Sequence, residues 1–243
     1  NIYPWLRLGR LGVEVRAVPT RDGRIDTAAM REAMDRRTRL VTAASVSFSP
    51  GYRSDLAGLG EHCARHDAFF LVDGVQSAGI LHHDFAVEPL GGFATSTSKG
   101  LLGIYGFGFL YVDPKWLDRL VPAFLSRTGV DIGTDDASAM GGTEYRLHAD
   151  GRRFELGSYN LAGAYAADAS LSLLLSVGTR TIERHVLDLA ARLREHNVPV
   201  EERYYDGIGH IEIVTSIGRL MRWRAPVLED MVNFFSSLGA LDG

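Results

Sequence analysis

Apolar runs alternate with helical segments over the first 112 residues of the chain. Residues 40–48 form an unbroken run of apolar and small side chains, and shorter runs follow at residues 69–73, 92–97 and 106–112. Runs without polar alternation are typical of strands that are covered on both faces of a parallel sheet. The pattern therefore predicts an α/β domain with a mainly parallel sheet flanked by helices.

Two helices are predicted between these strands, and each begins after an acidic residue of the kind that caps a helix N-terminus. Asp26 precedes a predicted helix over residues 27–37, and Asp55 precedes one that ends near residue 66. A further strand is predicted over residues 13–19.

The second half of the chain has a different pattern. Residues 126–151 are rich in Gly, Asp, Thr and Arg and show no periodicity, which predicts a long loop. Apolar residues at helical spacing then predict helices over residues 162–177 and 179–195. The remaining predicted elements are a short helix after residue 113, strands over residues 198–204 and 211–214, and a closing helix over residues 226–238.

Composition narrows the classes of function. The 243 residues are 46% hydrophobic and 23% charged, which is typical of a globular chain that buries a core. A net charge of -4 gives no basic face for nucleic acid. No apolar run approaches the roughly 20 residues that span a bilayer, so we expect no membrane partner and a cytoplasmic protein. The single Cys63 is predicted to be a small buried hydrophobe on a helix.

An acid and an amine stand at the ends of consecutive predicted strands. Asp73 ends the run at residues 69–73, and Lys99 follows the run at residues 92–97. Because ligands of open α/β sheets bind beyond the carboxyl ends of the strands, both side chains are expected in one crevice. Pyridoxal phosphate (PLP) chemistry uses such a pair, since a lysine binds the cofactor and an aspartate keeps the pyridine nitrogen protonated. Taken singly, Asp73 also fits a turn and Lys99 a surface lysine.

Hydroxyl groups precede the lysine. Ser96, Thr97 and Ser98 stand directly before Lys99, and a glycine follows it. Hydroxyls and backbone N–H groups are the donors that hold a phosphate, so this run is expected to supply them.

In these residues the chain resembles the class V (fold type I) aminotransferases, a family that includes cysteine desulfurases, kynureninase and isopenicillin N epimerase-like enzymes. The family has a strand ending in Val-Asp-X-X-Gln, a Ser-X-X-Lys that follows at the spacing of Asp73 and Lys99, and then a Gly-rich strand, here residues 106–112. The resemblance covers the chain from residue 1 to about residue 186. Further segments in the family's order are residues 4–5, 12–15, 22–26, 38–41, 51–56 and 153–158.

The resemblance implies a fold type I large-domain core and a role for each matching residue. Lys99 would bind PLP and move the proton at the substrate α-carbon, Asp73 would pair with the pyridine nitrogen, and Gln76 would contact the phenolic oxygen. The implied substrate is a small-molecule amino acid. Transamination, epimerisation, desulfuration and lyase chemistry all stay open.

Three serines match phosphate-side positions of the family. Ser96 and Ser98 belong to the run before the lysine, and the second is a histidine in many relatives. Ser158 matches a hydroxyl residue that reaches the phosphate of the neighbouring subunit, which implies a homodimer.

The chain also departs from the family. Phe48 stands where desulfurase-like members carry an asparagine, which favours the epimerase-like branch, and Gly91 replaces a common aspartate. The chain begins after the family's ring-stacking residue and phosphate-binding turn, so we expect an N-terminally truncated core. The alternative is a non-catalytic remnant with the fold and an incomplete site.

The C-terminal segment resembles another family. Residues 198–210 and 222–228 are similar to the last strand and helix of α/β-hydrolase esterases, with His210 at the position of the triad histidine. No Gly-X-Ser-X-Gly accompanies it, so a hydrolase is the weakest hypothesis. We predict a chimera with a PLP-binding domain over residues 1–188 and a small hydrolase-like α/β segment over residues 189–243.

Two other polar clusters are predicted to be loops and not metal sites. Residues 82–84 read His-His-Asp, and adjacent residues do not share a face of a helix or strand. Asp131, Asp135 and Asp136 lack the ligand pattern of a calcium loop.

Overall fold

A computed structural model describes residues 2–21, 23–48, 51–134, 136, 143–195 and 233. By its internal contacts the chain divides into two units, residues 1–188 and 189–243. The strands predicted over residues 198–204 and 211–214, His210, and the closing helix apart from Asn233 lie outside the described residues.

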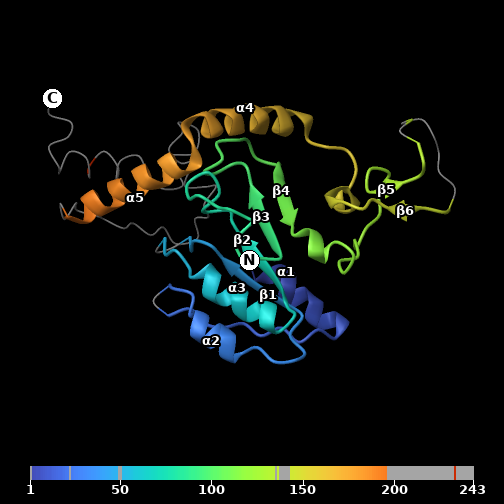
Figure 1. Cartoon of the computed structure of the whole chain (residues 1–243), viewed down its shortest axis with the longest axis horizontal. Coiled ribbons are helices and arrows are strands. Elements are labelled where there is room, and N and C mark those ends of the chain that lie inside the picture. The colour runs from blue at the N-terminus through green and yellow to red at the C-terminus, as the bar shows by residue number, and fades with distance from the viewer. Residues whose placement is uncertain are drawn as a thin grey trace. The chain divides into compact units, whose positions relative to one another are not determined.

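The central element is a four-stranded sheet in the order β1-β2-β3-β4 (Figure 1). β1 (Leu40–Ala44), β2 (Phe69–Asp73) and β3 (Gly92–Ser96) are parallel, and β4 (Gly108–Val112) runs antiparallel to β3. The prediction of an α/β fold with a mainly parallel sheet is therefore confirmed. Both the strand predicted from residue 40 and the one predicted from residue 106 are shorter than expected.

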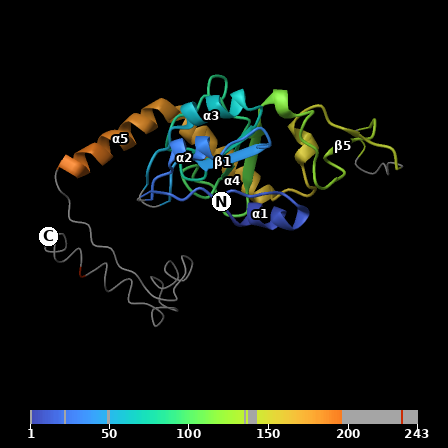
Figure 2. The ribbon, with the colours of Figure 1, turned by 90° about the horizontal axis from the view of Figure 1, so that it is seen from below.

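Helices and short turns connect and follow the strands. They are α1 (Tyr3–Leu6), η1 (Arg7–Leu11), α2 (Thr27–Glu32), α3 (Leu56–Arg65), η2 (Pro114–Trp116), η3 (Gly151–Phe154), α4 (Leu161–Val177) and α5 (Thr179–Glu195). α2 and α3 lie side by side in two perpendicular views (Figures 1 and 2). Among the described residues, no single helix is long and apolar enough to cross a membrane, and only α4 and α5 taken together, across a bend of 76°, reach that length and composition.

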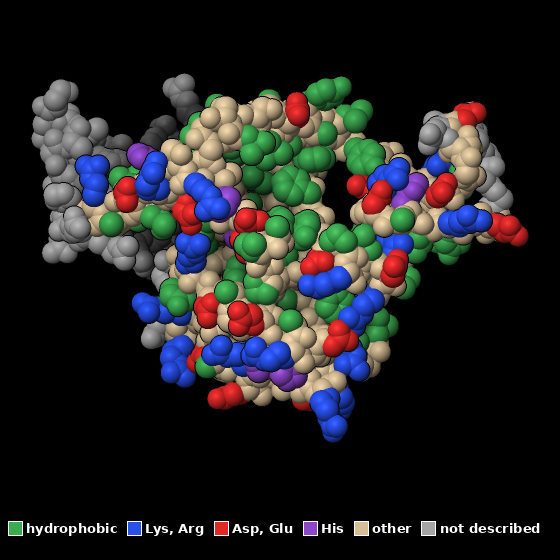
Figure 3. All heavy atoms as spheres, in the orientation of Figure 1, with side chains coloured by type: hydrophobic (Ala, Val, Ile, Leu, Met, Phe, Trp, Pro, Cys, Tyr) green, Lys and Arg blue, Asp and Glu red, His purple; other side chains and the backbone are tan. Residues whose placement is uncertain are grey.

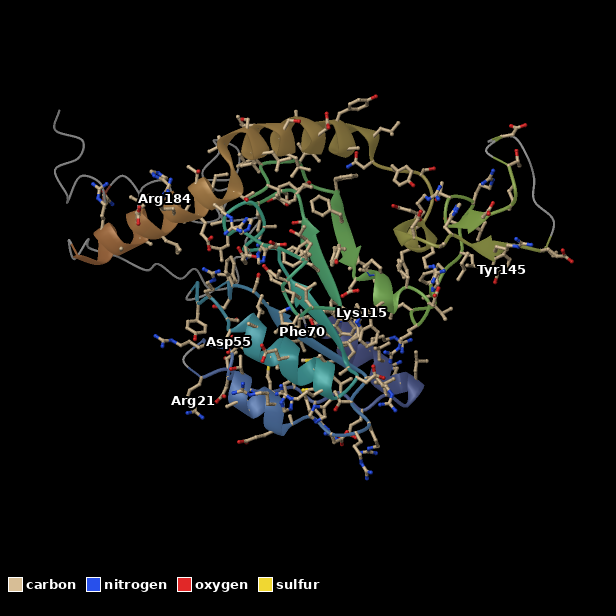
Figure 4. All side chains as sticks on the ribbon, in the orientation of Figure 1. Arg21, Asp55, Phe70, Lys115, Tyr145 and Arg184 are labelled. Carbon is tan, nitrogen blue, oxygen red and sulfur yellow. The ribbon has the colours of Figure 1, made fainter. Side chains whose placement is uncertain are left out.

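The predicted helix caps are confirmed. The Asp26 carboxylate accepts a hydrogen bond from the Ala29 N–H at 2.9 Å, and the Asp55 carboxylate accepts one from the Gly58 N–H at 3.1 Å. Asp55 lies at the beginning of α3 (Figure 4). Such a cap satisfies one of the N–H groups that a helix leaves unpaired in its first turn, and it contributes about 1 kcal/mol.

Two predictions about local structure are wrong. In the described structure residues 13–19 form no strand, and Arg16 there binds the Ala33 carbonyl oxygen at 2.7 Å instead. Residues 126–151 are not a plain loop, because β5 (Val130–Asp131) pairs with β6 (Arg146–Leu147). β5 and β6 are only two residues long each, which is too short for a periodic pattern of apolar residues to predict them.

The core lies between the sheet and α3. Phe70 and Val72 of β2 are almost completely buried together with Leu59 and Cys63 of α3. Figure 4 shows Phe70 in this position. Because side chains alternate along a strand, Asp73 projects from the opposite face to Phe70 and Val72. Burial of the one face fixes the register of β2, and with it the place of Asp73.

Candidate functional site

Residues that follow three adjacent strands come together at the carboxyl end of the sheet. Asp73 is the last residue of β2 and pairs in register with Ala94 of β3. Lys99 stands three residues beyond β3, and its Nζ lies 5.5 Å from the centre of the Phe48 ring, which follows β1. This contact joins the ends of β1 and β3, whereas the expectation that Asp73 and Lys99 share one crevice stays a prediction.

Two glycines pack the acid's loop against the lysine's loop. Gly79, with φ +83°, approaches the Gly100 backbone, and a Cβ added to Gly100 would lie 2.5 Å from the Ala78 carbonyl oxygen. A side chain at either position would force the two backbones apart. The turn that follows Asp73 is therefore in direct contact with the residue after Lys99.

The acid and the amine are not paired with each other. One oxygen of the Asp73 carboxylate accepts a hydrogen bond from the Val75 N–H at 3.1 Å. Within the described part of the chain, Asp73 forms no ion pair with a cation and Lys99 forms none with an anion. Lys99 is exposed, and Asp73 is half-buried. Both groups thus retain capacity to bind a ligand.

Thr97 does not offer its hydroxyl to a ligand, so that part of the prediction is corrected. Its side chain is completely buried and donates to the carbonyl oxygens of Ile104 and Phe107, at 3.1 and 3.2 Å. The Gly103 N–H also donates to the Thr97 carbonyl oxygen, at 2.7 Å. Thr97 therefore holds the loop that carries Lys99 in place.

Ser96 and Ser98 are brought together. Their hydroxyl oxygens are 3.4 Å apart, and both side chains are half-buried. A pair of neighbouring hydroxyls next to the lysine is compatible with the predicted phosphate side of the site.

No hydrogen bond of the described structure joins Gln76 or Ser158 to Ser96, Ser98 or Lys99. Gln76 lies half-buried in a tight turn, which the amides of Ser77 and Ala78 close by donating to the Gly74 carbonyl oxygen. Ser158 is exposed between η3 and α4, and in the described structure no hydrogen bond joins it to the other predicted residues. A hydrogen bond connects its segment to the loop between β3 and β4, which carries Lys99. The Asn160 side chain donates to the Gly106 carbonyl oxygen at 3.2 Å.

A partly buried chain of hydrogen-bonded polar groups was missed by the sequence reasoning. The hydroxyls of Ser45 and Ser77 lie 2.6 Å apart, Ser77 is 2.8 Å from Nε2 of His83, and Nδ1 of His83 is 3.2 Å from Glu88. His83 and its neighbour His82 lie in a loop, as predicted, but they have different partners. The one available signal was a serine inside the apolar run that forms β1.

The groups assembled here fit PLP by their chemistry. Asp73 keeps a carboxylate oxygen that can face a protonated pyridine nitrogen, and Lys99 has an amine outside any ion pair of the described structure. Ser96 and Ser98 add neighbouring hydroxyl donors. An acid, an amine and hydroxyl donors are what the cofactor's ring, aldehyde and phosphate require.

Comparisons with known proteins give a consistent family. The family model described as Aminotransferase class-V matches residues 1–203. A probable cysteine desulfurase from Methanothermobacter thermautotrophicus is 34% identical over 195 residues, which are 79% of this chain and 47% of the relative. The chain spans about half the length of the curated relatives it matches.

Solved structures share the fold. A cysteine desulfurase from Escherichia coli superimposes with a TM-score of 0.70 at 21% identity, over 91% of this chain and 57% of the other. A variant of C-DES with glycine covalently linked to its PLP cofactor gives a TM-score of 0.69 at 21% identity, over 90% and 61%. At such identities the likeness shows the fold and nothing more.

The comparisons also bear on the C-terminal segment. The family match continues to residue 203, beyond the predicted boundary at residue 188. Neither this match nor the similar structures support a hydrolase-like origin of residues 189–243 or a chimera. Together, the matched residues and the shared fold show that the chain belongs to the aminotransferase class V family, whose members are PLP-dependent, and that it is similar to cysteine desulfurases.

Proposed function

We propose that this chain is the PLP-binding core of an enzyme that acts on an amino acid, with Lys99 as the residue that binds the cofactor. One observation carries the proposal: the loops of Asp73 and Lys99 pack against each other through Gly79 and Gly100, while no ion pair of the described residues joins the acid to the amine. An acid and an amine in adjacent loops that do not neutralise each other are available to a ligand that binds both.

Each site residue then has a task. The Lys99 amine would hold the cofactor by its aldehyde and would carry the proton at the substrate α-carbon. The Asp73 carboxylate keeps a proton on the pyridine nitrogen, and Gln76 binds the phenolic oxygen. When bound, PLP supplies an electron sink for the carbanion of the substrate.

The phosphate is assigned to the hydroxyls. Ser96 and Ser98 lie next to each other and precede the lysine, so they bind the phosphate of the same subunit. Ser158 is exposed, which suits a residue that serves a neighbouring subunit. The substrate class is an amino acid, since relatives are named for cysteine and one structure carries glycine on its cofactor.

A homodimer completes this proposal. α4 carries apolar side chains on its exposed side as well as on its buried side, and helices that are apolar all round are normally covered. Figure 3 shows hydrophobic side chains gathered over α4 and the strands next to it. The exposed apolar residues that define this surface are Leu161, Tyr165, Leu173, Leu175 and Val177 of α4 and Phe109 of β4. We expect a second copy of the chain to cover this surface, named here the α4–β4 surface.

Reductive labelling tests the cofactor assignment. The purified protein is incubated with PLP, reduced with borohydride, digested and analysed by mass spectrometry, in parallel with Lys99→Ala and with Lys115→Ala as a matched control. We expect a reduced adduct on Lys99 in the parent protein and in Lys115→Ala, and none in Lys99→Ala. Lys115 is also exposed, but its Nζ is paired with Asp113 at 2.8 Å.

The opposite results are equally clear. An adduct that persists in Lys99→Ala, or one shared equally between Lys99 and Lys115, the two lysines of the chain, would contradict the assignment. A folded protein without any adduct would favour the second hypothesis, a non-catalytic protein that keeps the fold of the family.

A further inference from the structure

A continuous chain of hydrogen bonds runs from a carboxylate to the backbone of the proposed cofactor acid. Glu88 binds Nδ1 of His83, Nε2 of His83 binds Ser77, and Ser77 binds Ser45, with distances of 3.2, 2.8 and 2.6 Å. Ser45 then donates to the Asp73 carbonyl oxygen twice, from its N–H at 2.9 Å and from its hydroxyl at 3.1 Å. Both serines are buried, with 1% and 0% of their surface exposed.

The carboxylate end fixes the donors and acceptors along this chain. Burial raises the pKa of Glu88, but hydrogen bonds from His83 and from the Asp84 N–H lower it by more. The pKa of Glu88 therefore lies below its usual value. An ionised carboxylate only accepts hydrogen bonds, so Nδ1 of His83 donates, and in the neutral imidazole Nε2 is then the acceptor.

The hydroxyl protons follow from that assignment. Ser77 donates to Nε2 of His83 at 2.8 Å and, over a longer 3.4 Å, to the Gly74 carbonyl oxygen, and its own oxygen accepts from Ser45. The Ser45 hydroxyl therefore shares its one proton between Ser77 and the Asp73 carbonyl oxygen, as a three-centre hydrogen bond. The orientation of each group in the chain thus depends on the Glu88–His83 pair.

The His83 ring is itself held firmly. Its centre lies 4.8 Å from that of Phe93 and 6.1 Å from that of Phe85. Phe93 also packs beneath Gly74, where a Cβ would overlap the Phe93 ring. The imidazole, this aromatic ring and the turn that follows Asp73 therefore form one packed unit.

Serine, histidine and glutamate in this order resemble the triad of a hydrolase, but burial excludes that role. A nucleophilic serine must reach a substrate carbonyl, whereas Ser77 has no exposed surface and its hydroxyl is bound on two sides. The arrangement can act only on the protein around it.

We propose that His83, held by Glu88, is a positioning residue for the PLP ring. Through Ser77 and Ser45 it fixes the carbonyl end of β2 and the turn at residues 74–78, and thereby the places of the Asp73 carboxylate and the Gln76 side chain. This inference rests on the proposed function of Asp73 and Gln76 as ring ligands.

The first measurement needs no cofactor. Amide hydrogen exchange is followed in the cofactor-free protein and in Ser77→Ala, His83→Leu and His83→Gln, with His62→Gln on α3 as control. Each hydrogen bond contributes of the order of a factor of 3 to 10 in stability, so we expect the amides of Gly74, Val75 and Ala78 to exchange about 3 to 10 times faster in Ser77→Ala and His83→Leu. Glutamine retains an acceptor near the position of Nε2, so His83→Gln is expected between His83→Leu and the parent protein.

The second measurement adds PLP to the same proteins. We expect PLP to dissociate about 3 to 10 times more readily from Ser77→Ala and His83→Leu, with a shifted absorption maximum of the bound cofactor, partial recovery in His83→Gln and no change in His62→Gln. A change in absorption reports the surroundings of the ring, which a general loss of stability would not alter.

The outcomes separate the two proposals. Unchanged exchange in Ser77→Ala and His83→Leu would overturn the positioning role, as would faster exchange with unchanged affinity and absorption of PLP. If the parent protein binds no PLP on Lys99, the proposed function fails, and the positioning role for the ring fails with it even where the exchange results hold.

Discussion

Thr97 and Lys99 are two residues apart and meet opposite environments. The Thr97 hydroxyl is buried and bound to two carbonyl oxygens, so it can serve only the loop. The Lys99 side chain is exposed and lies over the Phe48 ring. At the scale of single residues, access to solvent decides which of two polar groups is available for chemistry.

Cys63 is a second residue whose chemistry depends on access to solvent, and its burial leads to a prediction. The thiol is 1% exposed, and burial raises its pKa to about 11. Since the thiolate is the reactive form, we expect negligible labelling of the native protein by a disulfide reagent at pH 8 and one thiol labelled per chain in urea. Absorbance of the released thiol measures both. Complete labelling of the native protein within minutes would contradict this burial.

The elements differ in how far the sequence predicts them. β2 and α3 are confirmed because their signals are local: β2 is a short apolar run, and α3 has an acidic cap and a helical pattern. α2 ends five residues early, since Asp35 and Thr38 close a turn through the hydrogen bonds between them. Residues 13–19 have the pattern of a strand, but a strand also needs a partner, which no local pattern supplies.

The candidate site also has one part that the sequence predicts and another part that it does not. The order of strand ends predicts that Asp73 and Lys99 lie in neighbouring loops, because sheet topology brings these ends together. The chain from Glu88 to Ser45 could not be predicted, since its link between Ser77 and Ser45 joins residues 32 positions apart through a register that forms only on folding. The prediction that the Thr97 hydroxyl binds phosphate was wrong because burial, and not residue type, determines whether a hydroxyl can reach a ligand.

The segment at residues 13–19 carries a second prediction. Arg16 binds Asp35 at 2.9 Å, and the hydrogen bond from Arg16 lowers the pKa of Asp35 from 3.8 to about 2. A lowered carboxyl pKa stabilises the folded state above the unfolded pKa of 3.8, and this stabilisation is lost as pH falls through about 2.

We therefore expect Asp35→Asn to be less stable than the parent protein at pH 6 and equal to it below pH 2. The urea midpoint of each protein, followed from pH 6 downwards, measures the difference. Because the pair is exposed, high salt should reduce the effect at pH 6. A difference that persists below pH 2 would show that Asp35 acts through something other than its charge.

On the scale of the whole molecule, the α4–β4 surface is an apolar surface that no described element of the chain covers. Leu173 is 57% exposed on α4, and exposed apolar side chains drive association when they lie together. We expect the chain to self-associate and Leu173→Glu to weaken the dimer at least tenfold, as measured by sedimentation velocity over a range of concentrations.

Val87→Glu is the control, since this exposed valine lies in the loop before Glu88 and outside the α4–β4 surface. Equal weakening by both substitutions would point to a general effect of added charge. A monomer at every concentration of the parent protein would contradict the proposed homodimer.

The antiparallel return of β4 has a consequence for the order of folding. It places Gly108 opposite Ser96, so the loop with Lys99 closes over a short stretch of chain, whereas β1 meets β2 only by joining Leu40 to Phe69. Closing a short loop costs less entropy than closing a long one, and local contacts form faster. The lysine hairpin is therefore expected to form first and the strand with Asp73 to join it later, so that capture of PLP would report the last steps of folding and not the first.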